Sequence, residues 1–299
     1  YKDYILNDRE ISTEKHLIEG KLIHCLLFEP ENISKKFKMV PEKAPSDNVR
    51  KILYKLKEIS NDNQDLLSTD NDWKDTILGI LKDQNLYQSL KKDNARLAKI
   101  QSKANVSYWK FISNTLVDVI DIDTLNKCMK RVEILKGNKA VMNLLHKNES
   151  DFELDTTRTY SEAYLECKLN SYKFGLKGFI DHYIIDENEK TITICDLKTT
   201  SKTIADFAET LDFYNYWLQA VIYCKLVFEN HKQDYEDFTI LFKFIVIDKY
   251  NQVYVFDVLQ STLDKWSNAL MDVLNQVNYH YTENNYTLPY DFLTSNVTI

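Results

Sequence analysis

The C-terminal half of the chain alternates between short strand-like runs and longer helical runs. Five runs are rich in β-branched and aromatic residues and are bounded by polar residues. They cover residues 159–169, 176–186, 190–200, 238–248 and 252–259. Residues 206–230, between the third and fourth runs, have helical length and spacing, and a last helix is expected from about 261 to 281. The order predicts an α/β fold with a mixed central sheet flanked by helices.

The N-terminal half is predicted to be mostly helical. Residues 13–30 have leucines near one helical face and end at a proline, and residues 37–40 fit a short edge strand. From about 49 to 145 nearly every segment has a helical pattern, and the last of the longer segments ends at Gly137. We therefore predict three regions: 1–45 as an N-terminal helix and edge segment of the core, 46–150 as a helical insertion, and 151–299 as the core.

Composition narrows the class of protein. The chain has 299 residues, of which 44% are hydrophobic, with only 5 Gly and 4 Pro, so we expect a globular protein rich in helices. Its 5 cysteines are scattered and never spaced as Cys-x-x-Cys, which argues against a disulfide framework, a zinc site or an iron–sulfur cluster and favours a reducing cytoplasm. No run of roughly 18 apolar residues and no signal pattern is present, so we expect no membrane association.

Two aspartates stand within strand-like runs, where an unpaired buried carboxylate would cost several kcal/mol. Residues 186–190 read as a hairpin loop. If Asp186 pairs with Thr191, paired numbers sum to 377, and Asp181 falls opposite Asp196 because 377 − 196 = 181. Opposed residues share a face, with Cβ atoms about 4.5–5.5 Å apart. The two carboxylates would repel each other unless a divalent cation such as Mg²⁺ lies between them.

Lys198 is predicted to lie on the same strand face as Asp196, two residues away. Its ammonium group would hold an attacking water or a phosphate oxygen and stabilise developing negative charge. A metal, an acid pair and a lysine are the parts needed for phosphodiester hydrolysis. The alternative is that Asp181 and Asp196 are ordinary strand-end residues and that Lys198 forms a surface salt bridge. A one-residue register shift would move one aspartate to the other face.

Three motifs together resemble those of the PD-(D/E)xK nuclease superfamily, and more narrowly the RecE-type (exodeoxyribonuclease VIII-like) exonucleases of phages and prophages. They are Gly178-Phe-Ile-Asp181, Asp196-Leu-Lys-Thr-Thr200 and Gln219-Ala-Val-Ile-Tyr223. An earlier segment, from Gly20 through His24 to Pro30, matches a further motif of that family. Ile180 stands where the superfamily's name has proline, a common variation.

The resemblance implies a role for each matching residue. Asp181 and Asp196 would bind the metal together with His24 and the backbone carbonyl of Leu197, and Lys198 would be the catalytic lysine. Gln219 and Tyr223, one helical turn apart, would position the nucleophile or a phosphate. The family also carries a glutamate about twenty residues before the first aspartate, which here is Glu162, with Glu166 as the fallback.

The resemblance also implies an activity: Mg²⁺-dependent exonuclease digestion of linear double-stranded DNA from an end, with Mn²⁺ able to substitute. It implies phage-type recombination, a single-strand annealing partner, a homo-oligomer and a location in the host cytoplasm. Two alternatives remain open. One is a structure-specific or end-independent RecB-like nuclease, and the other is a DNA-binding or assembly protein that kept the fold and lost catalysis.

Two aromatic segments are further candidates for DNA contact. Residues 82–110 hold seven basic and two acidic residues, so 7 − 2 = +5 in a chain whose net charge is −7, and Tyr108, Trp109 and Phe111 stand at the end of this segment. Basic residues with aromatics suit a DNA groove, although a solvated helix face explains them equally well. Tyr214, Tyr216 and Trp217 either stack on bases or belong to the core.

Overall fold

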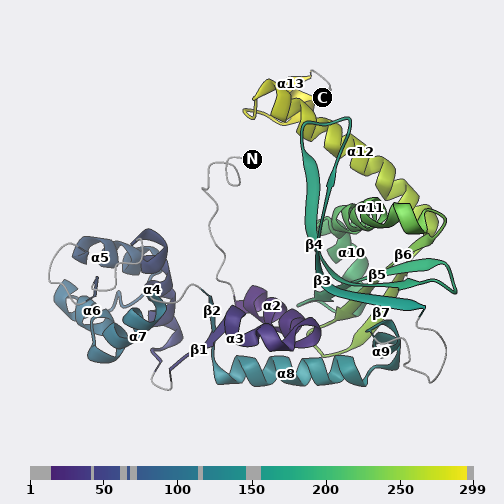
Figure 1. Ribbon diagram of the computed structural model, residues 1–299. Helices are drawn as coiled ribbons and strands as arrows, with labels where there is room; N and C mark the ends of the chain where they lie inside the picture. The colour runs from purple at the N-terminus through teal and green to yellow at the C-terminus, as the bar shows by residue number, and fades with distance from the viewer. Residues whose placement is uncertain are drawn as a thin grey trace. The chain divides into compact units, whose positions relative to one another are not determined.

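The computed structural model describes residues 15–41, 44–60, 66–67, 73–113, 117–145 and 156–294 (Figure 1). The chain divides into two compact units. Within the described residues, the first unit comprises 23–30 and 129–294, and the second comprises 15–22 and 31–128. The described residues include no helix long and apolar enough to cross a bilayer.

The first unit is built on a five-stranded mixed sheet. Its strands are β3 (Thr157–Lys168), β4 (Gly175–Asp186), β5 (Thr191–Thr199), β6 (Thr239–Ile247) and β7 (Val253–Val258). They lie in the order β3-β4-β5-β6-β7. Only the β5–β6 pair is parallel, and its crossover contains η2 (Ile204–Asp206), α10 (Phe207–Phe213) and α11 (Tyr216–Tyr235). The structure confirms the predicted element order and the mixed α/β sheet.

The β4–β5 hairpin has the predicted register. Asp186 pairs with Thr191, and its Oδ1 accepts hydrogen bonds from the backbone N–H groups of Asn188 and Glu189, each at 3.0 Å. These bonds fix the turn, and the turn sets the register of both strands. The ladder runs to the pair His182–Cys195, so Asp181 and Asp196 are the next residues in register where the strands separate.

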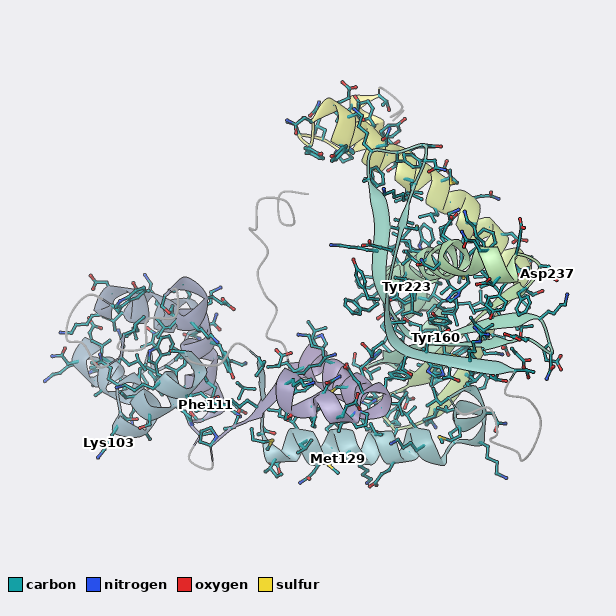
Figure 2. The ribbon with its side chains drawn as sticks, in the orientation of Figure 1. Lys103, Phe111, Met129, Tyr160, Tyr223 and Asp237 are labelled. Carbon is teal, nitrogen blue, oxygen red and sulfur yellow. The ribbon has the colours of Figure 1, made fainter. Side chains whose placement is uncertain are left out.

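Helix α11 covers one face of the sheet, and side chains fill the space between them (Figure 2). The core there contains Ile180, Tyr183, Ile194, Leu226 and Phe244, all at most 1% exposed. A second cluster, around Val221 and Leu270, joins α11 to α12 (Gln260–Glu283). The core anchors α11 against β4 and so positions the helix face that carries Gln219 and Tyr223.

The strict alternation of side chains breaks once in β3 and once in β4. Tyr160 and Ala163 both pack against the α11 core, although an odd separation puts them on opposite faces of a regular strand. Ile180 and Tyr183 do the same in β4. Glu162, which lies between Tyr160 and Ala163 in β3, has a left-handed backbone with φ of 48°, which is uncommon for a residue with a side chain. The break falls at Glu162 and Asp181.

Gly175 begins β4 at a place with no room for a side chain. An added Cβ would lie 2.4 Å from the carbonyl oxygen of Cys167 on the paired strand. We expect Gly175→Ala to lower the free energy of unfolding by about 1–3 kcal/mol, because backbone must move to relieve the clash. Gly137→Ala, where an added Cβ meets nothing within 4 Å, is the matched control and should change stability by less than about 1 kcal/mol. Denaturant titration of both variants measures the difference, and equal stabilities would contradict this account.

The remaining helices of the first unit are short or shared between the units. They are α8 (Ile122–Gly137), α9 (Lys139–Leu145) and α13 (Tyr290–Leu293). Helix α8 ends at Gly137, as its sequence predicts. Arg131 of this helix donates hydrogen bonds to the carbonyl oxygens of Ile247 and Asp248 at 3.2 and 2.8 Å, which ties α8 to the end of β6.

The second unit contains the predicted helical block. Its helices are α4 (Asp47–Ile59), α5 (Lys74–Asp83), α6 (Asp93–Ile100) and α7 (Lys103–Ser113), preceded by α2 (Lys15–Phe28, which continues into the first unit), η1 (Pro30–Asn32) and α3 (Ile33–Lys36). The edge strand is β1 (Phe37–Met39), and it pairs in parallel with β2 (Asp118–Ile120). Residues 118–120 are thus a strand within a region predicted to be almost entirely helical, because pairing with β1 decides the conformation of a segment too short to show a period.

Two aromatics of the basic segment are core residues. Tyr108 and Trp109 are 2% and 0% exposed and pack with Ile52, Leu56 and Ile77. The hypothesis that they stack on DNA bases is therefore wrong, since buried rings have no free face. The periodicity that places them on one side of α7 is a core pattern.

Candidate metal and catalytic site

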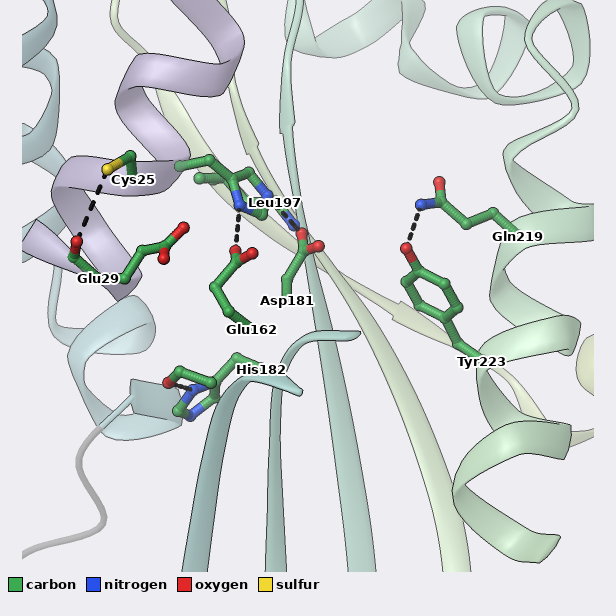
Figure 3. A network of polar contacts seen from close by, with 10 residues as sticks. Cys25, Glu29, Glu162, Asp181, His182, Leu197, Gln219 and Tyr223 are labelled. Atoms are coloured by element: carbon green, nitrogen blue, oxygen red, sulfur yellow. Dashed lines mark hydrogen bonds and ion pairs between the residues drawn. The ribbon is translucent and has the colours of Figure 1, made fainter. Parts of the chain in front are cut away.

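His24 connects the two acidic residues at the break in β3 and β4. Its Nδ1 lies 2.8 Å from Oε1 of Glu162, and its Nε2 lies 2.7 Å from Oδ2 of Asp181 (Figure 3). In Figure 3 the strands run between the end of α2 on one side and α11 on the other. Potential ligand atoms of the three residues all lie within 4.8 Å of one another. The fold thus joins residues more than 130 positions apart in sequence.

The charges of this cluster suit a cation. Burial lowers the pKa of His24, but the Asp181 and Glu162 carboxylates outweigh burial and raise the pKa to about 10. Glu162 and Asp181 also fall opposite each other, because the β3–β4 pairs sum to 343 and 162 + 181 = 343. The imidazolium therefore supplies the positive charge that two neighbouring carboxylates require. One imidazole nitrogen with carboxylate oxygens is a donor set that fits a divalent metal ion.

Asp196 and Lys198 form the second half of the site, on β5. The Asp196 side chain is fully buried, and Nζ of Lys198 lies 2.6 Å from its Oδ2, outside hydrogen-bonding geometry. Burial raises the pKa of Asp196; the Lys198 ammonium opposes the rise and the Asp181 carboxylate adds to it. Burial lowers the pKa of Lys198, but Asp196 and Asp181 raise it more, so the net shift is upward. Lys198 is therefore a cation at neutral pH.

Gln219 and Tyr223 extend the site along α11. Lys198 Nζ donates to Oε1 of Gln219 at 2.7 Å. Gln219 Nε2 donates to the Tyr223 hydroxyl oxygen at 2.7 Å (Figure 3). The ammonium also lies 4.5 Å from the ring centroid of Tyr216. Positions 219 and 223 share one helical face, as their spacing predicts. These contacts hold the ammonium next to Asp196.

Leu197 joins the two halves of the site. Its backbone N–H donates to Oδ2 of Asp181 at 2.8 Å, the same oxygen that contacts His24. A metal-binding role for the Leu197 carbonyl stays a prediction. Glu166, the fallback for Glu162, lies away from the cluster: it pairs with Lys177 and accepts a hydrogen bond from the Tyr164 hydroxyl. Glu162 is the glutamate that the structure brings to His24.

Two further contacts of the site have no motif in the sequence. The Phe28 ring stacks on the His182 ring with their centroids 5.9 Å apart, and its centroid lies 5.0 Å from that of the His24 ring. His182 Nδ1 and Ser161 Oγ lie 2.9 Å apart across β3 and β4. Phe28 is four residues after His24, so helical spacing alone places it on the same face. Ser161 faces His182 by the strand register.

Comparison with known proteins identifies the family. The profile of the PD-(D/E)XK nuclease superfamily matches residues 86–287, which cover more than half of the chain. No curated protein matches the chain. A crystal structure from Eubacterium rectale, described as that of a candidate exonuclease, is 12% identical with a TM-score of 0.37, over 85% of this chain and 99% of that one. The superfamily profile covers β3 to α12, which include Asp181, Asp196, Lys198 and the helix that carries Gln219 and Tyr223. This chain belongs to the PD-(D/E)XK nuclease superfamily, whose members use divalent metal ions.

Proposed function

We propose that the protein is a Mg²⁺-dependent exonuclease of the RecE-like kind that digests linear double-stranded DNA from an end, with Mn²⁺ able to replace Mg²⁺. One observation carries the proposal: the motif residues lie in two connected groups joined through Asp181. His24 and Glu162 meet Asp181 on one side, and Leu197 N–H links Asp181 to the strand that carries Asp196 and Lys198. A set of unrelated surface residues would not converge in this way.

Each residue has a defined task in this proposal. His24, Glu162, Asp181 and Asp196 would hold the metal, which when bound lowers the pKa of a water molecule and neutralises charge on the scissile phosphate. Lys198 stays protonated and stabilises the negative charge that develops on the phosphate oxygens. Gln219 holds the Lys198 ammonium through its Oε1, and Tyr223 fixes the Gln219 amide.

Digestion of two DNA forms tests the proposed activity. The protein is incubated with Mg²⁺ and either a linear duplex or a covalently closed circle. Release of nucleotides from the linear form alone supports the exonuclease. Cutting of the circle supports an end-independent RecB-like nuclease, and binding without cutting supports a protein that has lost catalysis. Either of these last two outcomes would overturn the proposal.

We expect the two glutamates of β3 to differ as metal ligands. We expect Glu162→Gln to weaken Mn²⁺ binding at least about 10-fold, because Glu162 lies in the His24 cluster. Glu166→Gln, on the same strand but outside the cluster, should leave the affinity unchanged. The measurement is the rise of the melting temperature with Mn²⁺ concentration. Equal Mn²⁺ responses of the two variants would refute this ligand assignment.

We further propose that the enzyme acts in phage-type recombination in the host cytoplasm. Digestion of one strand would expose the other for a single-strand annealing protein, and the enzyme would work as a homo-oligomer. These proposals follow from the resemblance of the motifs. Sedimentation of the purified protein tests the oligomer, and a monomer at all concentrations would contradict it.

A further inference from the structure

An aromatic pair lies on β3 and β4 directly beyond the carboxylates of the site. In the register that places Glu162 opposite Asp181, Tyr164 pairs with Phe179. Their ring centroids are 5.2 Å apart, and the ring planes are inclined at 56°. Two residues along a strand correspond to about 7 Å. Tyr164 and Phe179 are therefore the next same-face neighbours of Glu162 and Asp181 in this register.

Both rings are open to solvent on the face turned away from α11. Tyr164 is 49% and Phe179 is 59% exposed. The residues beside them in sequence, Ala163 and Ile180, pack into the core under α11, and Gly178 also faces α11 through Leu226 and Tyr223. The aromatic pair therefore points away from α11, to the side of the sheet on which His24 contacts the carboxylates. Figure 3 shows α2 and α11 on opposite sides of these strands. An exposed aromatic patch next to a site indicates a binding surface.

The charge around the pair matches a nucleic acid. The ribbon from Tyr164 to Phe179 carries three lysines and one acid, so 3 − 1 = +2 in a chain whose net charge is −7. They are Lys168, Lys173, Lys177 and Glu166. The Tyr164 hydroxyl donates a hydrogen bond to Oε2 of Glu166 at 2.9 Å. This bond orients the ring and gives the Glu166 carboxylate a partner. Lysines beside open rings supply phosphate contacts and stacking surfaces together.

We propose that Tyr164 and Phe179 form a stacking platform for a nucleobase of the strand being cut, next to the scissile phosphate. The inference rests on the proposed nuclease function and adds a positioning site to it. The platform begins two residues, or about 7 Å, along the strands from the carboxylates, so a phosphate held at the His24 cluster would have the rings beside it. Every base has a flat face, so stacking holds the strand without selecting a sequence.

A cycle of protein and DNA changes tests the platform. Linear duplexes carry one abasic nucleotide at successive positions near the end, and both Kd without metal and kcat/KM with Mg²⁺ are measured. For the wild-type protein, an abasic nucleotide at one position should weaken DNA affinity and lower kcat/KM by about 10-fold, the usual effect of losing one stacked base. The double variant Tyr164→Ala/Phe179→Ala should have about 10-fold weaker affinity and lower kcat/KM on intact DNA. An abasic nucleotide at that position should cause no further loss in this variant.

Two controls complete the experiment. Tyr164→Leu/Phe179→Leu keeps apolar bulk without rings and should behave like the alanine variant if stacking is the cause. Tyr254→Ala removes an equally exposed tyrosine, 54% exposed and in ring contact with Phe256, from edge strand β7, and should respond to the abasic series like wild type.

The outcomes separate the platform from the function. An alanine variant that discriminates the abasic position as strongly as wild type overturns the platform. The platform is also overturned if the alanine variant loses self-association but still discriminates abasic from intact DNA, because the two rings would then form a contact between copies of the chain. If the wild type cuts DNA but the ring substitutions and the abasic position act independently, the platform alone is refuted. If the wild type neither binds nor cuts DNA, the proposed function is refuted as well.

Discussion

Asp196→Asn is expected to abolish DNA hydrolysis, with a fall in rate on the order of 10³-fold or more. The substitution keeps the shape of the side chain and removes one negative charge from a fully buried position. Oδ2 of Asp196 forms an ion pair with the Lys198 ammonium at 2.6 Å, and within the described residues neither carboxylate oxygen accepts a hydrogen bond. Such a carboxylate is costly to bury, and a bound cation would offset that cost. Hydrolysis is measured on linear duplex DNA with saturating Mg²⁺.

Three further measurements make the Asp196 result specific. DNA affinity and the melting temperature without metal should stay close to those of wild type, and the stabilisation by Mn²⁺ should be lost. The matched control is Asp257→Asn, which removes a carboxylate paired with Lys243 on the same sheet but 69% exposed. The control should keep full activity. An active Asp196→Asn enzyme would mean that the chemistry takes place elsewhere.

Lys198→Met is expected to reduce hydrolysis by about 10²–10³-fold, the usual effect of losing one group that stabilises transition-state charge. Methionine keeps the apolar stem beside Tyr216 and removes the ammonium. The pKa of Lys198 is shifted upward, so the side chain is charged at neutral pH and acts as a cation, not as a proton acceptor. Raising the pH from 7 to 9 should therefore not activate the enzyme through Lys198.

Metal binding separates the roles of lysine and aspartate. Because Lys198→Met removes a positive charge beside Asp196, the affinity for Mn²⁺ should rise or stay constant while catalysis falls. The control Lys243→Met removes another lysine of the sheet that pairs with an aspartate, Asp257. A Lys198→Met variant that loses Mn²⁺ binding and activity together would show that the lysine supports the fold of the site and has no separate catalytic task.

The sheet and half of the site follow from local sequence signals. The polar turn at Asp186 fixes the register by its own side-chain hydrogen bonds, so the neighbourhood of Asp181 and Asp196 is predictable from residues close in sequence. The spacing of Lys198 from Asp196, and of Gln219 from Tyr223, follows from strand and helix periods. The structure confirms the fold class and places Lys198 between Asp196 and Gln219.

The rest depends on contacts between distant segments. No local pattern brings His24 to Asp181, 157 residues away, and only the resemblance to a family places it there. The left-handed backbone of Glu162 has no sequence mark, because glutamate does not favour it. Without that break, alternation gives the wrong face for Tyr164, so its exposure beside the site was unpredictable. Strand β2 forms only because β1 pairs with it.

Anomalous diffraction from a crystal soaked with Mn²⁺ tests the central claim most directly. We predict a peak at direct bonding distance from His24, Glu162, Asp181 and Asp196, with Lys198 Nζ beside it and outside the coordination sphere. A peak bound by other residues, or a fully occupied Mn²⁺ elsewhere with the His24–Asp181 contact still closed at 2.7 Å, would contradict it.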